Sequence, residues 1–166
     1  MAALSRRSWI SLPFLAAASD RSHSRSTVYS TRGIVSTSHA LASQVGAQIL
    51  ARGGTAADAA LAANLALSAV EPMMCGPGGD FFLLYYEART GKLHGLNASG
   101  PAPRGLSPQA LASNGLNSMP VSGIHSVTVP GAVDGWWRTH ARFGRLPWRD
   151  LFSGAIDLAE AHPVHE

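Results

Sequence analysis

The chain has 166 residues, of which 46% are hydrophobic and only 14% are charged, and its formal net charge is +3. Residues 1–32 carry five arginines and one aspartate, a net charge of +4, whereas residues 33–166 carry a net charge of −1. No basic stripe therefore runs over the folded part, which argues against a nucleic-acid partner, and a single cysteine excludes an internal disulfide framework.

Residues 1–32 form a basic N-terminal arm, and we expect this arm to be a flexible lead-in to the first strand. Arg6 and Arg7 precede an apolar stretch ending in three alanines at residues 16–18, which is an alternative that suits a secretory signal. Many serines and arginines with few acids would also suit a mitochondrial presequence. A cytoplasmic location is the first expectation, and secretory or mitochondrial targeting are the alternatives.

A strand that begins at Gly33 is predicted to lead into a helix that starts near His39, with Ser38 as its N-cap. Apolar residues recur every four positions on one face of this helix (Leu41, Val45 and Ile49). Arg52 suits the negative end of the helix dipole, and Gly53 can adopt the left-handed conformation that ends a helix.

A second helix follows at once, because Thr55 and Asp58 have the spacing of a variant capping box. Residues 59–70 contain no charge, so this helix should be buried on every side, packed under a sheet. The uncharged run is shorter than the ~20 residues that span a bilayer, and we therefore expect no membrane span.

A glycine loop at residues 75–80 comes next and leads into a predicted hairpin. The loop residues expected to have a structural role are Gly76, Gly78, Gly79 and Asp80, the last through backbone hydrogen bonds. Residues 81–86 are all large and apolar or aromatic, which predicts a strand covered on both faces. Turn residues at 87–91 and a returning strand at 92–97 complete the hairpin.

The remaining elements are shorter. Ser107 and Pro108 predict the start of a helix that ends at Ser113, and the alternation in residues 126–129 predicts a strand. A helix at residues 132–143 carries a stripe of large side chains, which is a core face or, as an alternative, a ligand platform (Val133, Trp136, Trp137, His140 and Phe143). Pro147 and Trp148 should open a last helix that reaches Ala161.

Common cofactor and metal motifs are missing from the sequence. The glycine loop has Phe81 where a dinucleotide-binding fingerprint needs its third glycine, and it leads from a helix into a strand, the reverse of a phosphate-binding turn. His162, His165 and Glu166 lie close together but lack the pair of histidines four residues apart used by zinc hydrolases. Cys75 has no histidine near it in sequence, so we expect an inert thiol. We therefore expect no cofactor and no metal site.

Six ordered stretches resemble the N-terminal part of the large subunit of γ-glutamyltranspeptidases, also called glutathione hydrolases, and in particular the branch of γ-glutamyltranspeptidase-like proteins. They are residues 25–43 (RSTVYSTRGIVSTSHALAS), 49–72 (ILARGGTAADAALAANLALSAVEP), 76–86 (GPGGDFFLLYY), 95–103 (GLNASGPAP), 126–136 (SVTVPGAVDGW) and 146–164 (LPWRDLFSGAIDLAEAHPV). Their order and spacing cover most of the chain.

This resemblance implies an α/β (α+β) fold that is part of the four-layer αββα sandwich of the N-terminal-nucleophile (Ntn) hydrolases. Members are proenzymes that cleave themselves into two subunits, and the new N-terminal threonine attacks a γ-glutamyl amide with its own α-amino group as base. The family's threonine lies beyond the end of this chain, so no catalytic residue is assigned here. We expect residues 33–166 to be an incomplete large-subunit domain that pairs with the small subunit of the same proenzyme.

The resemblance also points to candidate substrate-binding residues at the end of the hairpin, Asn97 and Ser99. Ser99 stands where typical members have an arginine that clamps the substrate α-carboxylate, and a serine offers neither charge nor a bidentate fork. A second difference is at Ala161 and His162, where the usual glycine before an aromatic residue is missing. Asn and Ser also commonly satisfy turns, so a purely structural role for both candidates is the alternative.

The expected function is therefore part of an amidohydrolase for γ-glutamyl substrates such as glutathione. Two alternatives remain at the level of sequence: a non-catalytic fragment that acts as an interaction module, and an amidohydrolase for another small acyl amide.

Overall fold

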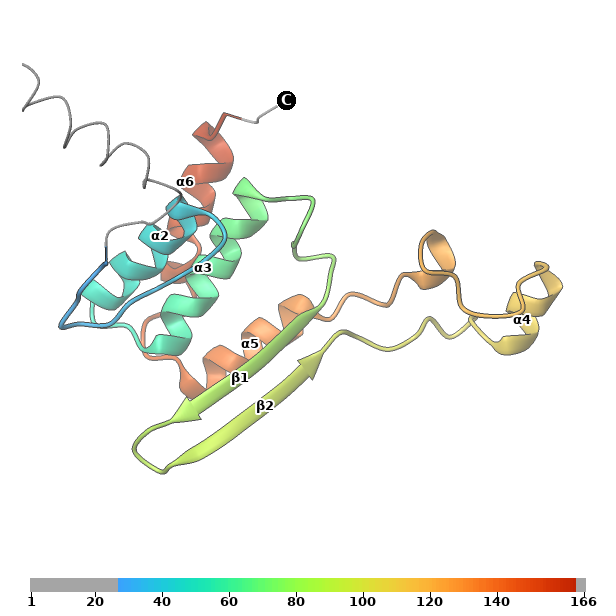
Figure 1. The fold of residues 1–166 in the computed structure, drawn as a ribbon, viewed down its shortest axis with the longest axis horizontal. Helices are drawn as coiled ribbons and strands as arrows, with labels where there is room; N and C mark the ends of the chain where they lie inside the picture. The colour runs from blue at the N-terminus through green and yellow to red at the C-terminus, as the bar shows by residue number, and fades with distance from the viewer. Residues whose placement is uncertain (1–26, 164–166) are drawn as a thin grey trace, which may run out of the picture. The chain divides into compact units, whose positions relative to one another are not determined.

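The computed structural model describes residues 27–163 and divides the chain into two compact units, residues 1–31 and 32–166. In the first unit, the described residues 27–31 form no helix or strand, and the targeting features expected at residues 6–18 lie outside the described range. In the second unit, helices gather in one layer and a β-hairpin packs against one of them (Figure 1).

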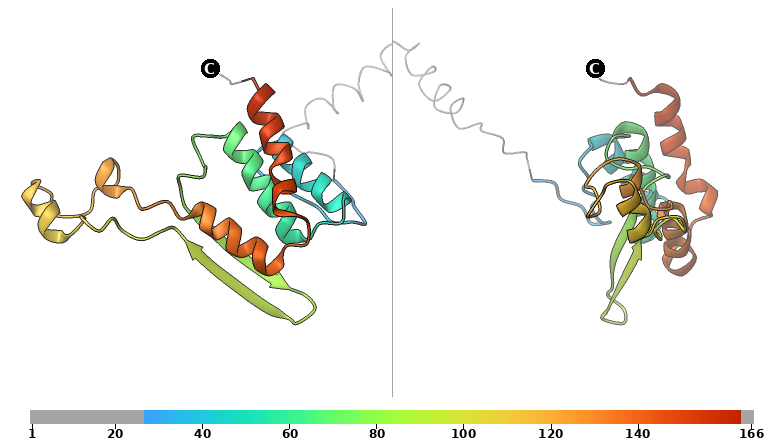
Figure 2. Two further views of the ribbon diagram at one scale, coloured as in Figure 1. Left: turned by 180° about the vertical axis from the view of Figure 1, so that it is seen from behind. Right: turned by 90° about the vertical axis from the view of Figure 1, so that its right-hand side faces the viewer.

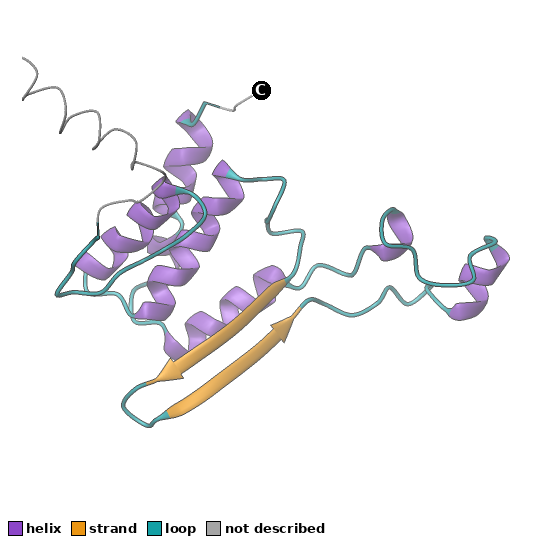
Figure 3. Cartoon of the chain, in the orientation of Figure 1, coloured by secondary structure: helices purple, strands orange, loops and turns teal. Residues whose placement is uncertain are grey.

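Nine elements make up the described part of the second unit (Figure 3). They are α2 (Ala40–Ala51), α3 (Ala56–Val70), β1 (Phe81–Glu87), β2 (Lys92–Ala98), α4 (Pro108–Ser113), η1 (Ile124–Ser126), α5 (Ala132–Phe143), η2 (Trp148–Leu151) and α6 (Ser153–Ala161). The prefix η marks a 3₁₀ helix. The strand predicted to begin at Gly33 is wrong, because residues 33–37 pair with neither of the two described strands.

Helix α2 begins one residue later than the sequence predicted. His39 is the N-cap, and its Nδ1 accepts a hydrogen bond from the backbone N–H of Leu41 at 3.3 Å. Ser38, the predicted cap, instead donates a hydrogen bond from Oγ to Oε2 of Glu71 at 2.6 Å. Its hydroxyl therefore binds a partner that is distant in sequence and does not cap the helix. The end of the helix is as predicted, with Gly53 at a φ of +88°.

Helix α3 lies at the centre of the helical layer. The predicted capping box is confirmed, and eight of its residues are buried. Among the described residues α3 packs chiefly against α2, α5, α6 and η2 (Figure 2), while Phe81 of β1 packs against the same core cluster, so the predicted contact with a sheet is limited to the hairpin. Alanine at most of its contacts lets these helices approach closely, and the core cluster around α3 includes Leu61, Leu65 and Trp136.

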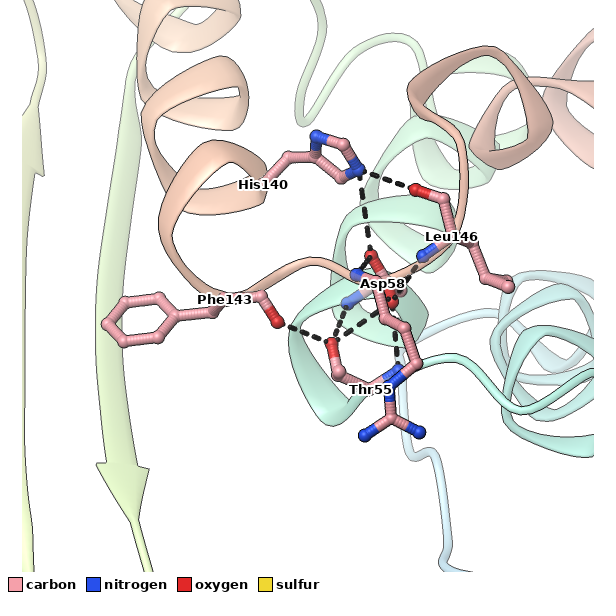
Figure 4. Close-up of polar contacts among 6 residues, drawn as sticks. Thr55, Asp58, His140, Phe143 and Leu146 are labelled. Carbon is pink, nitrogen blue, oxygen red and sulfur yellow. Dashed lines mark hydrogen bonds and ion pairs between the residues drawn. The ribbon is translucent and has the colours of Figure 1, made fainter. Parts of the chain in front are cut away.

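The carboxylate of Asp58 joins the start of α3 to the loop after α5 (Figure 4). Its side chain is completely buried, and its oxygens accept hydrogen bonds from the backbone N–H groups of Thr55 (2.9 Å), Arg145 (2.9 and 3.2 Å) and Leu146 (3.3 Å). His140 lies nearby, with Nε2 2.8 Å from the Leu146 carbonyl oxygen and 3.9 Å from Asp58 Oδ1. A buried charge is therefore balanced mainly by backbone donors.

The two strands pair antiparallel from Phe81 opposite Ala98 to Glu87 opposite Lys92. Helix α5 covers one face of this hairpin; Tyr85 stacks on Phe143 with ring centroids 4.2 Å apart. The other face is open: the side chains of Phe82, Leu84 and Tyr86 are 64%, 79% and 63% exposed. The prediction that β1 is covered on both faces is thus wrong for the described residues, because they provide only one covering layer.

Between the hairpin and α5 the chain forms a long excursion that carries α4 and η1 and extends away from the helices (Figure 1). Helix α4 is as predicted, with Ser107 as N-cap and Pro108 at its first position. The strand predicted at residues 126–129 is wrong: η1 ends at Ser126, and the following residues form one backbone bond to the hairpin side, from Val129 N–H to the Pro101 carbonyl at 3.0 Å.

The C-terminal region differs from the prediction in one respect. The helix expected to open at Pro147 is divided into η2 and α6, which meet at Phe152. Helix α5 has the predicted bounds, but its stripe is only partly core, because Trp136 is buried while Trp137 is 53% exposed. In residues 27–163, no helix has both the length and the apolar character needed to cross a membrane.

Candidate functional site

Three segments that are far apart in sequence meet at one end of the hairpin. They are the end of the glycine loop (79–80), the end of β2 with the residues after it (97–101) and the residues up to the start of α5 (128–132). The first two are neighbours because Phe81 pairs with Ala98, which places the start of β1 beside the end of β2. We call this meeting point the hairpin junction.

The glycine loop caps α5 at the hairpin junction. The carbonyl oxygen of Gly79 accepts hydrogen bonds from the backbone N–H groups of Gly131 (3.2 Å) and Ala132 (3.0 Å) at the start of the helix. These N–H groups have no partner within the helix, so the loop satisfies donors that would otherwise be open. At Gly76 and Gly78 an added Cβ would meet nothing within 4 Å, so packing in the described chain does not require glycine there.

Asp80 contacts a side chain from a distant segment. Its Oδ1 lies 3.1 Å from Oγ1 of Thr128, and the same hydroxyl lies 2.9 Å from the carbonyl oxygen of Ser99. Thr128 therefore bridges the glycine loop and the candidate substrate-binding residues. Sequence analysis missed Thr128, and no local signal could have found it, because its partners are 48 and 29 residues away.

Asn97 and Ser99 are adjacent at the hairpin junction. The Oδ1 atom of Asn97 accepts a hydrogen bond from the Ser99 backbone N–H at 3.0 Å, which is an Asx turn. Asn97 also borders an open hollow of about 710 Å³ on the exposed face of the hairpin, together with Phe82 and Leu84. Among residues 27–163, the Asn97 amide N–H₂ and the Ser99 hydroxyl have no hydrogen-bond partner, so both can contact a ligand.

The remaining reactive side chains have environments that do not activate them. Burial raises the pKa of the Cys75 thiol, and this effect exceeds the opposing hydrogen bond from Ser68. The thiol is therefore largely protonated at neutral pH, as expected for an inert residue. Glu87, in the hairpin turn, has a lowered pKa chiefly because the Thr90 hydroxyl donates to its Oε2 at 2.8 Å.

No three histidine, cysteine, aspartate or glutamate side chains of the described residues are grouped so that they could hold a metal ion. His165 and Glu166, which were considered as ligands in the sequence, lie outside the described range. Two other histidines have structural contacts: His94 approaches Glu87 at 3.4 Å and Arg142 at 3.1 Å, and His140 contacts the loop after α5.

Comparison with solved structures places this arrangement in a known fold. The chain matches the γ-glutamyltranspeptidase of Helicobacter pylori with a TM-score of 0.72 and 30% identity over 81% of this chain and 39% of that one. It matches a cephalosporin acylase from Bacillus halodurans with a TM-score of 0.77 and 42% identity over 85% of this chain and 26% of that one. The γ-glutamyltranspeptidase structures are Ntn-hydrolase folds, and the described residues form part of such a fold.

The γ-glutamyltranspeptidase family model matches residues 42–166. A glutathione hydrolase-like proenzyme of Bacillus subtilis, YwrD, is 38% identical over 135 residues, which are 81% of this chain and 25% of that proenzyme. The chain therefore belongs to the γ-glutamyltranspeptidase family, and it corresponds to the N-terminal part of the large subunit. It spans about a quarter or less of the length of the curated relatives it matches first.

Proposed function

We propose that this chain forms the N-terminal part of the large subunit of an amidohydrolase that acts on small γ-glutamyl amides such as glutathione. The match of residues 42–166 to the family model carries this proposal. In it, residues 33–166 supply part of the catalytic domain, residues 1–32 precede that domain, and the partner is the small subunit of the same proenzyme.

The reaction needs a nucleophile and a site that orients the acyl group. The nucleophile is the N-terminal threonine of the small subunit: its hydroxyl attacks the amide carbon and its α-amino group takes the proton and passes it to the leaving amine. Water then hydrolyses the resulting ester. This chain contributes orientation, through the Asn97 amide and the Ser99 hydroxyl at the hairpin junction.

The full-length product of the gene tests this proposal. We expect two fragments on a denaturing gel after self-cleavage, and release of p-nitroaniline from γ-glutamyl-p-nitroanilide. A proenzyme that is cleaved but hydrolyses no acyl amide would refute the proposal.

A second substrate class is favoured by one residue. Ser99 offers a single neutral hydroxyl, so it recognises an α-carboxylate less strongly than a cationic fork would. An acyl group without a terminal carboxylate, such as butyryl, would lose little at such a site. The similarity to a cephalosporin acylase supports this candidate.

The two substrate classes are separated by one variant. Ser99→Arg should lower the KM for γ-glutamyl-p-nitroanilide by roughly tenfold or more relative to butyryl-p-nitroanilide, which has no carboxylate, because a charge-assisted hydrogen bond contributes about 1.5–3 kcal/mol. Ser118→Arg, at an exposed position away from the hairpin junction, is the matched control for the added charge. If Ser99→Arg leaves the ratio of the two KM values unchanged, Ser99 does not face the acyl group.

A further inference from the structure

We propose that Thr128 is the positioning residue that sets the orientation of Ser99 toward the substrate, and that Asp80 holds Thr128 in place. The inference rests on the proposed function of Ser99 as a substrate contact. It is carried by the geometry of the hairpin junction, where one hydroxyl lies between two acceptors from different segments.

The Thr128 hydroxyl has one proton and two acceptors within reach, the Ser99 carbonyl oxygen at 2.9 Å and Asp80 Oδ1 at 3.1 Å. A carboxylate oxygen and a carbonyl oxygen both accept here, so the one proton is shared between them or donated to one at a time. The side chain of Thr128 is half-buried, whereas its contact with Asp80 is exposed to water. The observed rotamer keeps the hydroxyl within reach of both acceptors.

The Ser99 peptide needs such a restraint because Gly100 follows it. Gly100 has a φ of +85°, and glycine crosses between left- and right-handed conformations with little energy difference. The direction of the Ser99 carbonyl is thus not determined by local backbone preference. It is determined by the donors that reach it, and Thr128 supplies the side-chain donor.

Close backbone packing makes this coupling stiff. A Cβ at Gly100 would lie 1.8 Å from the Val129 carbonyl oxygen, and one at Gly131 would lie 2.3 Å from that of Ala98. The two segments are therefore in direct backbone contact on both sides of Ser99, at Ala98 and at Gly100. No layer of side chains separates the two backbone segments, so a shift of the backbone at Thr128 also shifts Ser99.

Asp80 connects this unit to the glycine loop. The residue before it, Gly79, caps the start of α5 through its carbonyl oxygen, so the backbone at Asp80 is anchored to that helix. The Asp80 carboxylate is then a second acceptor for the Thr128 hydroxyl, beside the Ser99 carbonyl oxygen. This explains a role for an acidic residue at the end of the glycine loop that needs no metal and no direct substrate contact.

The test measures kcat and KM of the full-length, self-cleaved enzyme with γ-glutamyl- and butyryl-p-nitroanilide. Thr128→Val removes the hydroxyl at nearly constant volume, and we expect KM to rise about five- to tenfold with kcat changed less than about twofold, the equivalent of one hydrogen bond. Thr128→Ser keeps the donor and should restore KM to within about twofold of wild type. Asp80→Asn, which keeps an acceptor oxygen, should have a smaller effect than Asp80→Ala.

Thr90→Val is the matched control. Thr90 also donates to a carboxylate and to a backbone carbonyl, both of Glu87, but at the turn at the other end of the hairpin. The KM of the Thr90→Val variant should equal that of wild type.

Four outcomes would overturn the inference. A Thr128→Val enzyme with normal KM and a lower apparent kcat per total protein would show that Thr128 only supports folding or processing. A Thr128→Ser enzyme as impaired as Thr128→Val would show that the hydroxyl is not responsible. A wild-type enzyme inactive toward both amides would refute the proposed function and, with it, this inference. An active wild-type enzyme with an unaffected Thr128→Val variant would refute the inference alone.

Discussion

Replacing Asp58 with alanine should be the most damaging single change to the helical layer. The Asp58 side chain is fully buried between the start of α3 and the loop after α5. The substitution would remove the acceptor for the backbone N–H groups of Thr55, Arg145 and Leu146. A cavity lined by backbone donors would remain, and the alanine methyl group cannot satisfy any of them.

The expected magnitude follows from the number of donors. A buried donor without a partner costs about 1–3 kcal/mol, and the loss of one member of a buried charged network costs about 3–5 kcal/mol. With three donors affected, one of them at 3.3 Å and therefore weak, we expect the free energy of unfolding to fall by about 3–5 kcal/mol. Domains of this kind are stable by only about 5–15 kcal/mol, so the loss would be a large share of the total.

Urea denaturation followed by tryptophan fluorescence measures this change. Asp58→Asn keeps one acceptor oxygen and should lose less than Asp58→Ala. Asp150→Ala is the control, because it removes a partly exposed ion pair to Arg52 at 3.2 Å and should cost no more than about 1 kcal/mol. If Asp58→Ala unfolds within about 1 kcal/mol of wild type, the carboxylate does not hold the two segments together.

Three further predictions concern single positions. Gly100→Ala should lower the melting temperature by about 4 °C or more, because a side chain at a φ of +85° costs about 1–2 kcal/mol. The new Cβ would also meet the Val129 carbonyl oxygen. An unchanged melting temperature would contradict the packing of the hairpin junction. Cys75 should react with iodoacetamide at pH 7.5 more slowly than free cysteine, because burial raises its pKa; equal rates would show an open thiol. Thr90→Val should raise the pKa of Glu87 in a carbon NMR titration. Since the pKa of Glu87 is lowered in the folded chain, its carboxylate stabilises the fold at neutral pH, and this contribution is lost as the pH falls through the folded pKa.

Several local features could be read from the sequence because they depend on neighbours in the chain. The capping box of Thr55 and Asp58, the start of α4 at Ser107 and the left-handed end of α2 at Gly53 all appear where predicted. In each, the donor and acceptor or the required backbone conformation belong to residues within a few positions of one another. Such chemistry is present before the chain folds.

The predictions that were wrong depended on partners from elsewhere in the chain. The Ser38 hydroxyl could cap the helix, but it donates a hydrogen bond to Glu71 instead, and His39 is the N-cap. The apolar run of β1 predicts burial on two faces, yet the described residues cover only one. The alternation at residues 126–129 is typical of a strand, but a strand forms only beside another strand, and Val129 bonds to Pro101 in the irregular segment after β2 instead.

The candidate site divides in the same way. The motif around Asn97 and Ser99 could be recognised in the sequence, and its residues do lie together in an Asx turn. The position of Thr128 between Ser99 and Asp80 could not be recognised. By itself, the sequence determined where α3, α4 and α5 begin, where α2 ends and which residues are apolar, since these properties follow from short-range hydrogen bonding and side-chain chemistry. Only the tertiary structure decided which distant groups share a proton, because that depends on contacts between segments that come together only when the whole chain folds.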